Sequence, residues 1–173
     1  MSGYLNKEFY LIKVEDNFIK NFSRTYPNER LLYATNKSYN DILMYKQTTN
    51  NIEIIAIPEY EEEQSSPLDS FYIWEYNIHI KNHSSEVVQL LRRHWILVDD
   101  KGQVQEIEGD GVIGLQPVLK QGEEFEYSSC VHLTQPSGVM MGSYEMTRAD
   151  GDIIKVEIPS FSLDCPHIKQ LAN

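Results

Sequence analysis

The sequence predicts an all-β protein, an antiparallel β-sandwich of seven to eight strands. Short runs in which apolar and polar residues alternate recur at regular spacing, and clusters of turn-forming residues separate them. The 173 residues include 11 Tyr, six Phe and two Trp, residue types that favour strands over helices. No segment alternates strands with helices. Short, evenly spaced strands of this kind are typical of the immunoglobulin or fibronectin III type of sandwich.

The strand pattern starts at about residue 46, which divides the chain into three parts. Residues 1–43 form an N-terminal extension without period-2 alternation, residues 44–166 form the β-sandwich domain, and residues 167–173 form a C-terminal tail. Within the extension, apolar residues stand at a helical spacing at positions 14, 18, 19 and 22. The extension is therefore either a short amphipathic helix or a loosely attached tail.

The first half of the domain contains three expected strands. The first covers residues 51–57 and is expected to end at Pro58. The second, residues 71–80, places one set of large apolar side chains on a single face: Tyr72, Trp74, Tyr76, Ile78 and Ile80. A long strand over residues 87–98 follows. A hairpin turn at residues 99–102, with Gly102 at the position that needs a positive φ, ends this half.

The second half continues the same pattern. A return strand begins over residues 104–107, and further strands are expected over 124–130, 139–146 and 154–158. The dipeptide Asp150-Gly151 predicts a hairpin between the last two. The last strand is expected to stop at Pro159.

Charge and composition exclude several classes of protein. The net charge is −11, and residues 44–173 carry a net −12 while residues 1–43 carry +1. An acidic domain repels phosphate backbones, so we expect no nucleic-acid partner. No apolar run approaches the roughly 18 residues of a membrane span, so we expect no membrane partner either. The absence of a secretory signal pattern and the presence of two cysteines favour a cytoplasmic location.

The stretch "GDGVIG", residues 109–114, matches the dinucleotide-binding pattern G-x-G-x-x-G. That motif needs a helix after it, and Pro117 disfavours a helix here. Two alternatives stay open for Gly109, Gly111 and Gly114. They either present backbone N–H groups to a phosphate, or they form a bulge or corner where the chain crosses between sheets.

The sequence contains no recognisable catalytic constellation. It has no G-x-S-x-G elbow, and Cys130 and His132 do not form a convincing dyad. His79 and His83 share a strand face, but two ligands do not make a zinc site. The run Glu61–Glu63 is able to attract Mg²⁺ or Co²⁺, but such runs are usually solvated loops. We therefore predict no catalytic residue, no metal site and no cofactor.

One basic segment stands out in the acidic domain: Arg92, Arg93, His94 and Trp95. These residues either pair internally with local carboxylates or contact a partner protein. Loops and edges of a rigid sandwich commonly carry recognition, which makes the segment a candidate partner-binding site. A free strand edge would also permit a homodimer, so the sequence leaves monomer and homodimer open.

Several long stretches resemble the bacterial ApaG family. They are "EEEQSSP", "VQLLRRHWILVDDKGQVQEIEGDGVIGLQPVLKQGEEFEYSS", "PSGVMMGSYEM" and "VEIPSFSLD", and the resemblance runs from about residue 44 to 166. Bacterial members usually begin near the position of Met44, so residues 1–43 depart from the family. They are either a lineage-specific extension, or translation starts at Met44.

The resemblance implies a fibronectin III-like β-sandwich without an established enzymatic reaction. It also implies a link to cobalt and magnesium homeostasis, a gene neighbourhood shared with a diadenosine tetraphosphate hydrolase, and protein-interaction roles in eukaryotic relatives. The family's glycine pattern, proposed as a pyrophosphate site, corresponds here to Gly109, Gly111 and Gly114.

Three functions are compatible with these observations. The leading hypothesis is a non-enzymatic module that binds another protein. The second is a sensor that binds a nucleotide or pyrophosphate at the glycine-rich loop, with or without Mg²⁺ or Co²⁺. The third is a dinucleoside polyphosphate hydrolase, which the absence of a recognisable nucleophile disfavours.

Overall fold

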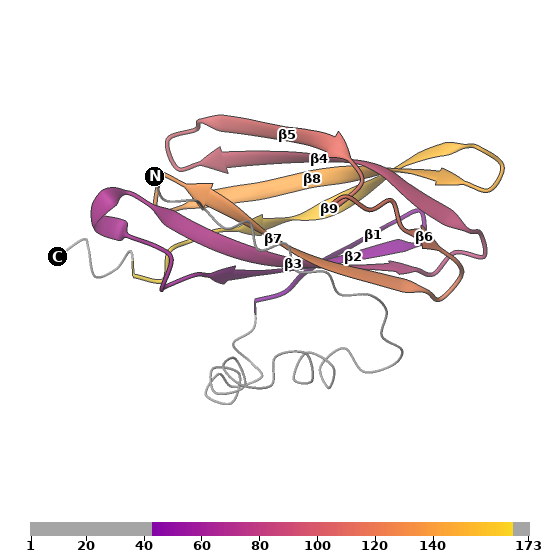
Figure 1. Cartoon of the computed structure of the whole chain (residues 1–173), viewed down its shortest axis with the longest axis horizontal. Helices are drawn as coiled ribbons and strands as arrows, with labels where there is room; N and C mark the ends of the chain where they lie inside the picture. The colour runs from indigo at the N-terminus through magenta and orange to yellow at the C-terminus, as the bar shows by residue number, and fades with distance from the viewer. Residues whose placement is uncertain (1–42, 168–173) are drawn as a thin grey trace, which may run out of the picture.

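Two antiparallel β-sheets packed face to face make up the domain (Figure 1). The computed structural model describes residues 43–167. The helix expected within the N-terminal extension lies outside the described residues. Within the described range the sandwich prediction is confirmed, and the one short helical element is a 3₁₀ turn at Pro67–Asp69. No helix in this range has the length and hydropathy that a membrane span requires.

The first sheet has the strand order β1-β2-β3-β7. Its strands are β1 (Tyr45–Thr49), β2 (Ile52–Tyr60), β3 (Tyr72–Asn82) and β7 (Glu124–Leu133). The five apolar side chains expected on one face of the second strand are all buried in β3, as predicted. Side chains of a strand alternate between its faces, so the residues between them point to the outer face of this sheet.

The second sheet has the order β5-β4-β8-β9, and a two-residue strand, β6, also pairs with β4. Its strands are β4 (Val88–Asp99), β5 (Val104–Asp110), β6 (Val118–Leu119), β8 (Gly138–Arg148) and β9 (Ile153–Ser162). The predicted hairpin turns are present, with Gly102 at φ 74° and Gly151 at φ 87°. The sandwich is closed along the side where β1 meets β9, because the Tyr45 hydroxyl bonds the Ser162 hydroxyl at 2.8 Å.

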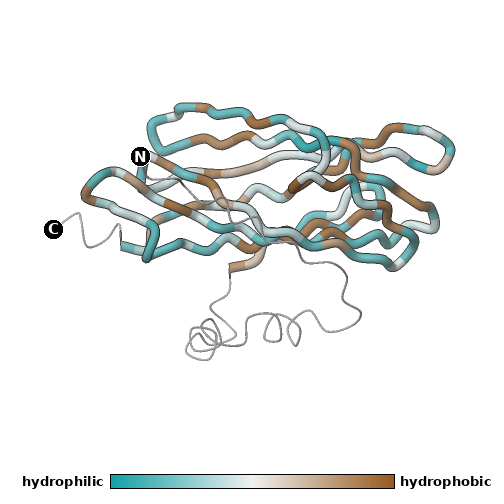
Figure 2. Tube along the Cα trace, viewed as in Figure 1, coloured by the Kyte–Doolittle hydropathy of each residue, from teal (hydrophilic) through white to brown (hydrophobic). Residues whose placement is uncertain are grey.

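Aromatic rings from both sheets fill the space between them. The ring of Trp95 on β4 lies 5.3 Å from that of Tyr76 on β3 and 6.0 Å from that of Phe161 on β9, measured between centroids. Figure 2 shows the hydropathy alternating along the strands, as expected when one face of each sheet is buried. This core fixes the two sheets relative to each other.

Two strands run past the prolines that were expected to end them. β2 continues through Pro58 to Tyr60, and β9 continues through Pro159 to Ser162. Beyond Ala56, β2 has no pairing with β1, so the missing N–H of Pro58 faces the unpaired side of the strand. Pro159 falls where the register between β8 and β9 shifts, and β9 is the last strand of its sheet. Edges and bulges are where a sheet tolerates proline.

The structure contains nine strands within residues 43–167, compared with the seven to eight expected. One addition is β6, which is too short to leave a pattern in the sequence. The other is β1, which is separated from β2 by Asn50 and Asn51, both at positive φ. Asparagine tolerates this conformation, so the two residues form the tight turn between β1 and β2, and the strand expected from Asn51 starts at Ile52 instead.

Candidate functional site

The glycine-rich stretch begins as the last part of a strand and ends as a tight turn. Gly109 and Asp110 belong to β5. Val112 and Leu115 then exchange two main-chain hydrogen bonds of 2.8 and 2.9 Å around Ile113 and Gly114, whose φ values are 44° and 78°. Because β6 rejoins β4 after this turn, the chain does not cross between sheets here. The expectation of a corner between sheets is therefore wrong. The loop lies between β5 and β6, which both pair with β4.

Two of the glycines are explained by their neighbours. Gly109 lies opposite Arg93 in the β4–β5 register, and a Cβ at Gly109 would stand 3.1 Å from the guanidinium. That guanidinium donates hydrogen bonds from Nη1 to the carbonyl oxygens of Asp110 and Gly111, at 3.2 and 2.8 Å. A Cβ at Gly111 would lie 2.1 Å from the carbonyl oxygen of Leu115. The glycines thus admit Arg93 and allow the backbone to fold closely on itself.

The same contacts bear on phosphate binding. An anion nest needs backbone N–H groups that point at the ligand. The N–H of Gly111 donates to the Leu91 carbonyl oxygen at 2.7 Å, and those of Val112 and Leu115 donate to each other's carbonyl oxygens. These three donors are already used, so packing accounts for the glycines at least as well as anion binding does.

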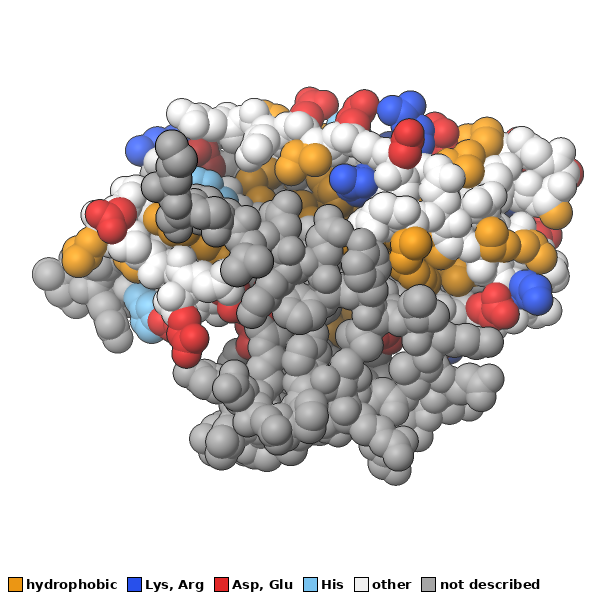
Figure 3. Space-filling view, in the orientation of Figure 1, with side chains coloured by type: hydrophobic (Ala, Val, Ile, Leu, Met, Phe, Trp, Pro, Cys, Tyr) orange, Lys and Arg blue, Asp and Glu red, His pale blue; other side chains and the backbone are white. Residues whose placement is uncertain are grey.

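The charged side chains of β4 and β5 form a ladder on the outer face of the second sheet. Arg92 Nε lies 3.5 Å from an Asp110 carboxylate oxygen, and its Nη2 lies 4.0 Å from one of Glu108. His94 Nε2 lies 3.2 Å from a Glu106 oxygen. Figure 3 shows acidic and basic side chains along the edge of the molecule where β5 runs in Figure 1. Arg92 and His94 thus show the internal pairing that was one alternative, and Arg92 stays half exposed.

The fourth residue of the basic segment points the other way. Trp95 is 2% exposed and lies in the aromatic core. Arg93 shares its side of the strand and is partly buried under the glycine-rich loop. Of the segment expected to contact a partner, only Arg92 and His94 therefore present their side chains on the outer face of the sheet.

An apolar strip continues the ladder along the same face. Val98 of β4 lies between Val104 of β5 and Val139 of β8 in the register. Ile96, two residues before Val98, faces the same side and pairs with Met141. Val104 is 60% exposed and Val139 39% exposed. We call this strip together with the charged ladder the outer patch; its residues are Arg92, His94, Ile96, Val98, Val104, Glu106, Glu108, Asp110, Val139 and Met141.

Sequence reasoning found only part of the outer patch. The expected hairpin at residues 99–102 already places Val98 opposite Val104, so this pair could have been derived from the turn. Val139 and Met141 lie some 40 residues further along the chain. Their position beside β4 depends on the sheet order, and no local pattern carries that order.

Comparison with known proteins places the whole domain in one family. Residues 62–148 match a family model described as the ApaG domain. The chain is 50% identical over 130 residues to a protein named ApaG from Paramagnetospirillum magneticum, and 49% identical over 130 residues to one from Sinorhizobium fredii. Each alignment covers 75% of this chain and 100% of the relative.

Solved structures agree with this placement. The fold matches the crystal structure of a Bordetella pertussis protein carrying the name ApaA, with a TM-score of 0.66 and 38% sequence identity, over 69% of this chain and 97% of that one. It also matches an X-ray structure from a structural genomics programme, with a TM-score of 0.64 and 35% identity, over 69% of this chain and 90% of that one.

Proposed function

This chain belongs to the ApaG family, and on that premise we propose that it is a non-enzymatic module that binds another protein through the outer patch. The observation that carries the proposal is the exposed apolar strip beside a ladder of charges on one rigid sheet. Protein-binding surfaces combine a desolvated apolar centre with a polar rim in this way. The apolar strip around Val98 supplies the centre, and the charged ladder of β4 and β5 supplies the rim.

The charge of the rim indicates the chemistry of the partner. Three carboxylates, those of Glu106, Glu108 and Asp110, lie near one guanidinium and one imidazole. The rim is therefore acidic, as is the chain as a whole with its net charge of −11. A protein that offers an apolar surface flanked by Lys or Arg would complement it, and the opposite charges would speed association.

Photo-crosslinking from the exposed valines tests this proposal. A crosslinking residue is placed at Val104 in one variant, at Val139 in a second, and at Ile153 in a control. Ile153 is 51% exposed and lies on β9, the opposite edge strand of the same sheet. The two patch positions are expected to capture the same protein, and Ile153 is not.

The captured protein is then purified and its affinity measured. Val104→Lys should weaken binding about tenfold, because a central apolar contact is worth about 1–2 kcal/mol. Ile153→Lys should leave the affinity within twofold. Equal capture from all three positions, or an affinity insensitive to Val104→Lys, would contradict the proposal.

Arg93 favours a second candidate, a sensor of nucleotides or pyrophosphate. Its partly buried guanidinium lies against the glycine-rich loop, where it could meet a phosphate. Titration of the ¹⁵N-labelled chain with ATP, diadenosine tetraphosphate and pyrophosphate, with and without Mg²⁺ or Co²⁺, tests this candidate. Saturable chemical-shift changes confined to residues 109–114 would support the sensor, and the absence of shift changes at millimolar ligand would contradict it.

The third candidate, a dinucleoside polyphosphate hydrolase, is tested by phosphorus NMR of the same samples, which detects turnover of the ligand.

A further inference from the structure

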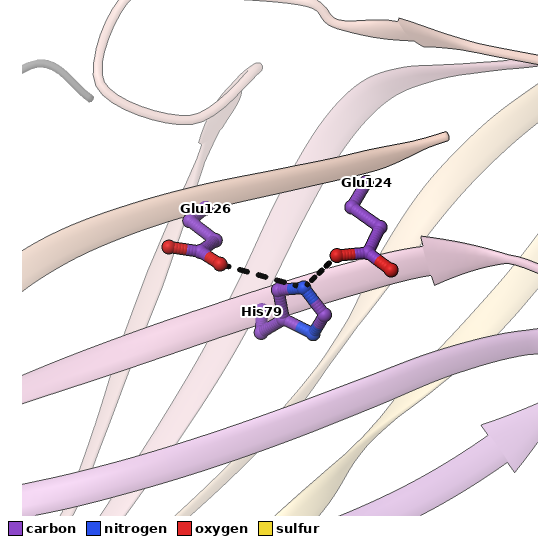
Figure 4. Close-up of side chains that lie close together, drawn as sticks. All are labelled: His79, Glu124 and Glu126. Carbon is purple, nitrogen blue, oxygen red and sulfur yellow. Dashed lines mark hydrogen bonds and ion pairs between the residues drawn. The ribbon is translucent and has the colours of Figure 1, made fainter. Parts of the chain in front are cut away.

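A second cluster of ligating side chains lies on the outer face of the other sheet, away from the outer patch. His79 of β3 stands opposite Glu126 of β7, and Glu124 lies two residues before Glu126 on the same face. The imidazole points at both carboxylates (Figure 4). His79 Nε2 lies 2.9 Å from Glu124 Oε2 and 3.5 Å from Glu126 Oε1. His79 is only 6% exposed, and the Glu124 and Glu126 side chains are 23% and 38% exposed.

We propose that His79, Glu124 and Glu126 form a binding site for a divalent transition cation of the Zn²⁺ type. One imidazole nitrogen and two carboxylate oxygens are ligands that zinc accepts, with solvent or a fourth group completing the tetrahedron. Mg²⁺ fits less well, because it prefers oxygen ligands alone.

The separations between the three donor atoms suit such an ion. Ligand atoms about 2.0–2.1 Å from a tetrahedral zinc lie roughly 3.3 Å from one another. The two His79–carboxylate separations, 2.9 and 3.5 Å, fall on either side of this value. All three donor atoms lie within 4.8 Å of one another. Small side-chain movements on two adjacent strands would therefore complete the site, with the backbone left in place.

Lys81 holds one of the ligands in position. Its ammonium forms an ion pair with Oε1 of Glu124, whereas Oε2 of the same carboxylate faces His79. A carboxylate ligand whose second oxygen is engaged in this way is oriented before the ion arrives. Burial acts to raise the pKa of Glu124, but hydrogen bonds from Lys81 and His79 outweigh it and leave the pKa lowered.

Glu124 and Glu126 place two carboxylates on the same face of β7. Burial raises the pKa of Glu126; His79 opposes this effect, and the negative charge of Glu124 adds to it. Two carboxylates on the same partly buried face repel each other, and a divalent ion between them would relieve that repulsion.

A chemically identical cluster elsewhere in the chain serves as a matched comparison. His94, Glu106 and Glu108 also bring one imidazole and two carboxylates within reach of one ion. Their carboxylate side chains are 60% and 62% exposed, compared with 23% and 38% for Glu124 and Glu126. An exposed side chain loses conformational entropy when it binds an ion. The side chains of the more buried cluster have already lost most of that entropy on folding. The buried cluster should therefore bind the ion more tightly.

Calorimetric titration of the full chain with Zn²⁺ tests the assignment. We expect saturable binding at one site per chain, weakened at least 100-fold by Glu124→Gln/Glu126→Gln. Glu126→Gln alone, which leaves the Lys81 ion pair intact, should weaken it at least tenfold. Glu106→Gln/Glu108→Gln should change the affinity less than twofold, and circular dichroism of each variant checks that the sandwich persists.

An imidazole-specific NMR measurement gives a second readout. Addition of Zn²⁺ should shift the ring-nitrogen resonance of His79 far more than that of His94. The assignment is overturned if Zn²⁺ shows no saturable binding, if both double variants weaken it equally, or if the His94 resonance is the one that moves. None of these outcomes depends on the protein partner proposed for the outer patch.

Discussion

At the scale of single residues, the three glycines of "GDGVIG" perform three different tasks. Gly109 leaves room for the guanidinium of Arg93. Gly111 combines a φ of 59° with close contact to the Leu115 carbonyl. Gly114 has a φ of 78° but open space where a Cβ would stand. A motif that looks uniform in the sequence therefore predicts unequal effects of substitution.

Gly111→Ala should destabilise the domain far more than Gly114→Ala. At Gly111 a Cβ would meet the Leu115 oxygen at 2.1 Å, so the turn must break, at a cost of about 3 kcal/mol or more. At Gly114 only the left-handed conformation is penalised, by about 1–2 kcal/mol. Urea unfolding of both variants measures the difference, and equal losses would contradict this account of the loop.

Sequence reasoning located the positive-φ glycines of the hairpins but could not decide the role of this motif. Gly102 and Gly151 follow from local turn patterns. The role of Gly111 depends on Leu115 across a tight turn, and that of Gly109 depends on Arg93 across a strand pair. The hydrogen bonds that use the loop's N–H groups appear only when the pairing is known.

At the scale of elements, Asn82 ties three segments together. Its side chain is fully buried at the end of β3. The amide nitrogen donates to the carbonyl oxygens of Glu86 at 2.7 Å and of Leu119, on β6, at 2.9 Å. The amide oxygen accepts from the backbone N–H of Ser84 at 2.9 Å. One side chain thus fixes the turn after β3 and anchors the two-residue strand β6.

Asn82→Ala should lower the free energy of unfolding by about 3 kcal/mol, because it leaves two carbonyl oxygens and an N–H without their partner in and near the core. Asn82→Asp should cost at least as much, since a carboxylate oxygen would replace the donor that faces the carbonyls of Glu86 and Leu119. Denaturant unfolding with amide hydrogen exchange checks both the size and the place of the effect. Unchanged exchange at Leu119 would show that Asn82 does not hold β6.

Strand positions were predictable because period-2 patterns are local, but strand ends were not. Pro58 and Pro159 predict strand ends, yet both are tolerated. At Pro58, β2 has no pairing with β1, and at Pro159 the register between β8 and β9 shifts. Asn82 is the last residue of β3, and nothing in the sequence shows that it bonds to a residue 37 positions away. Local patterns thus fix the strands, and contacts between elements decide where they end.

At the scale of the whole molecule, the pairing of distant strands creates the candidate sites. His79 and Glu126 are neighbours only because β3 pairs with β7. The spacing in the sequence groups His79 with His83 on one strand face. The two imidazoles bind different carboxylates instead, with His83 Nε2 lying 3.4 Å from Glu53. No metal site was predicted, because two histidines alone do not make a zinc site. The strand order that brings Glu124 and Glu126 to His79 leaves no local pattern in the sequence.

The two sheets are also joined by a hydrogen bond in the core, between the hydroxyls of Tyr127 on β7 and Tyr144 on β8, at 2.6 Å. Burial is the main cause that raises the pKa of both phenols, and it raises that of Tyr76 as well. The folded domain therefore keeps these groups protonated at pH values where the unfolded chain, with tyrosine pKa values near 10, releases the protons.

Stability should accordingly be constant with respect to these groups below pH 10 and fall as the pH rises above it, by about 1.4 kcal/mol per pH unit for each buried tyrosine. Tyr127→Phe/Tyr144→Phe removes two of the three groups, so its stability should decline less steeply. The same variants test the hydrogen bond itself near pH 8. There each single variant should lose about 1 kcal/mol of unfolding free energy, because one hydroxyl stays buried without its partner. The double variant should lose less than the two single losses added together. Urea unfolding from pH 8 to 11 measures both effects. Parallel pH profiles for the parent and the double variant would show that ionisation of this pair does not drive alkaline unfolding.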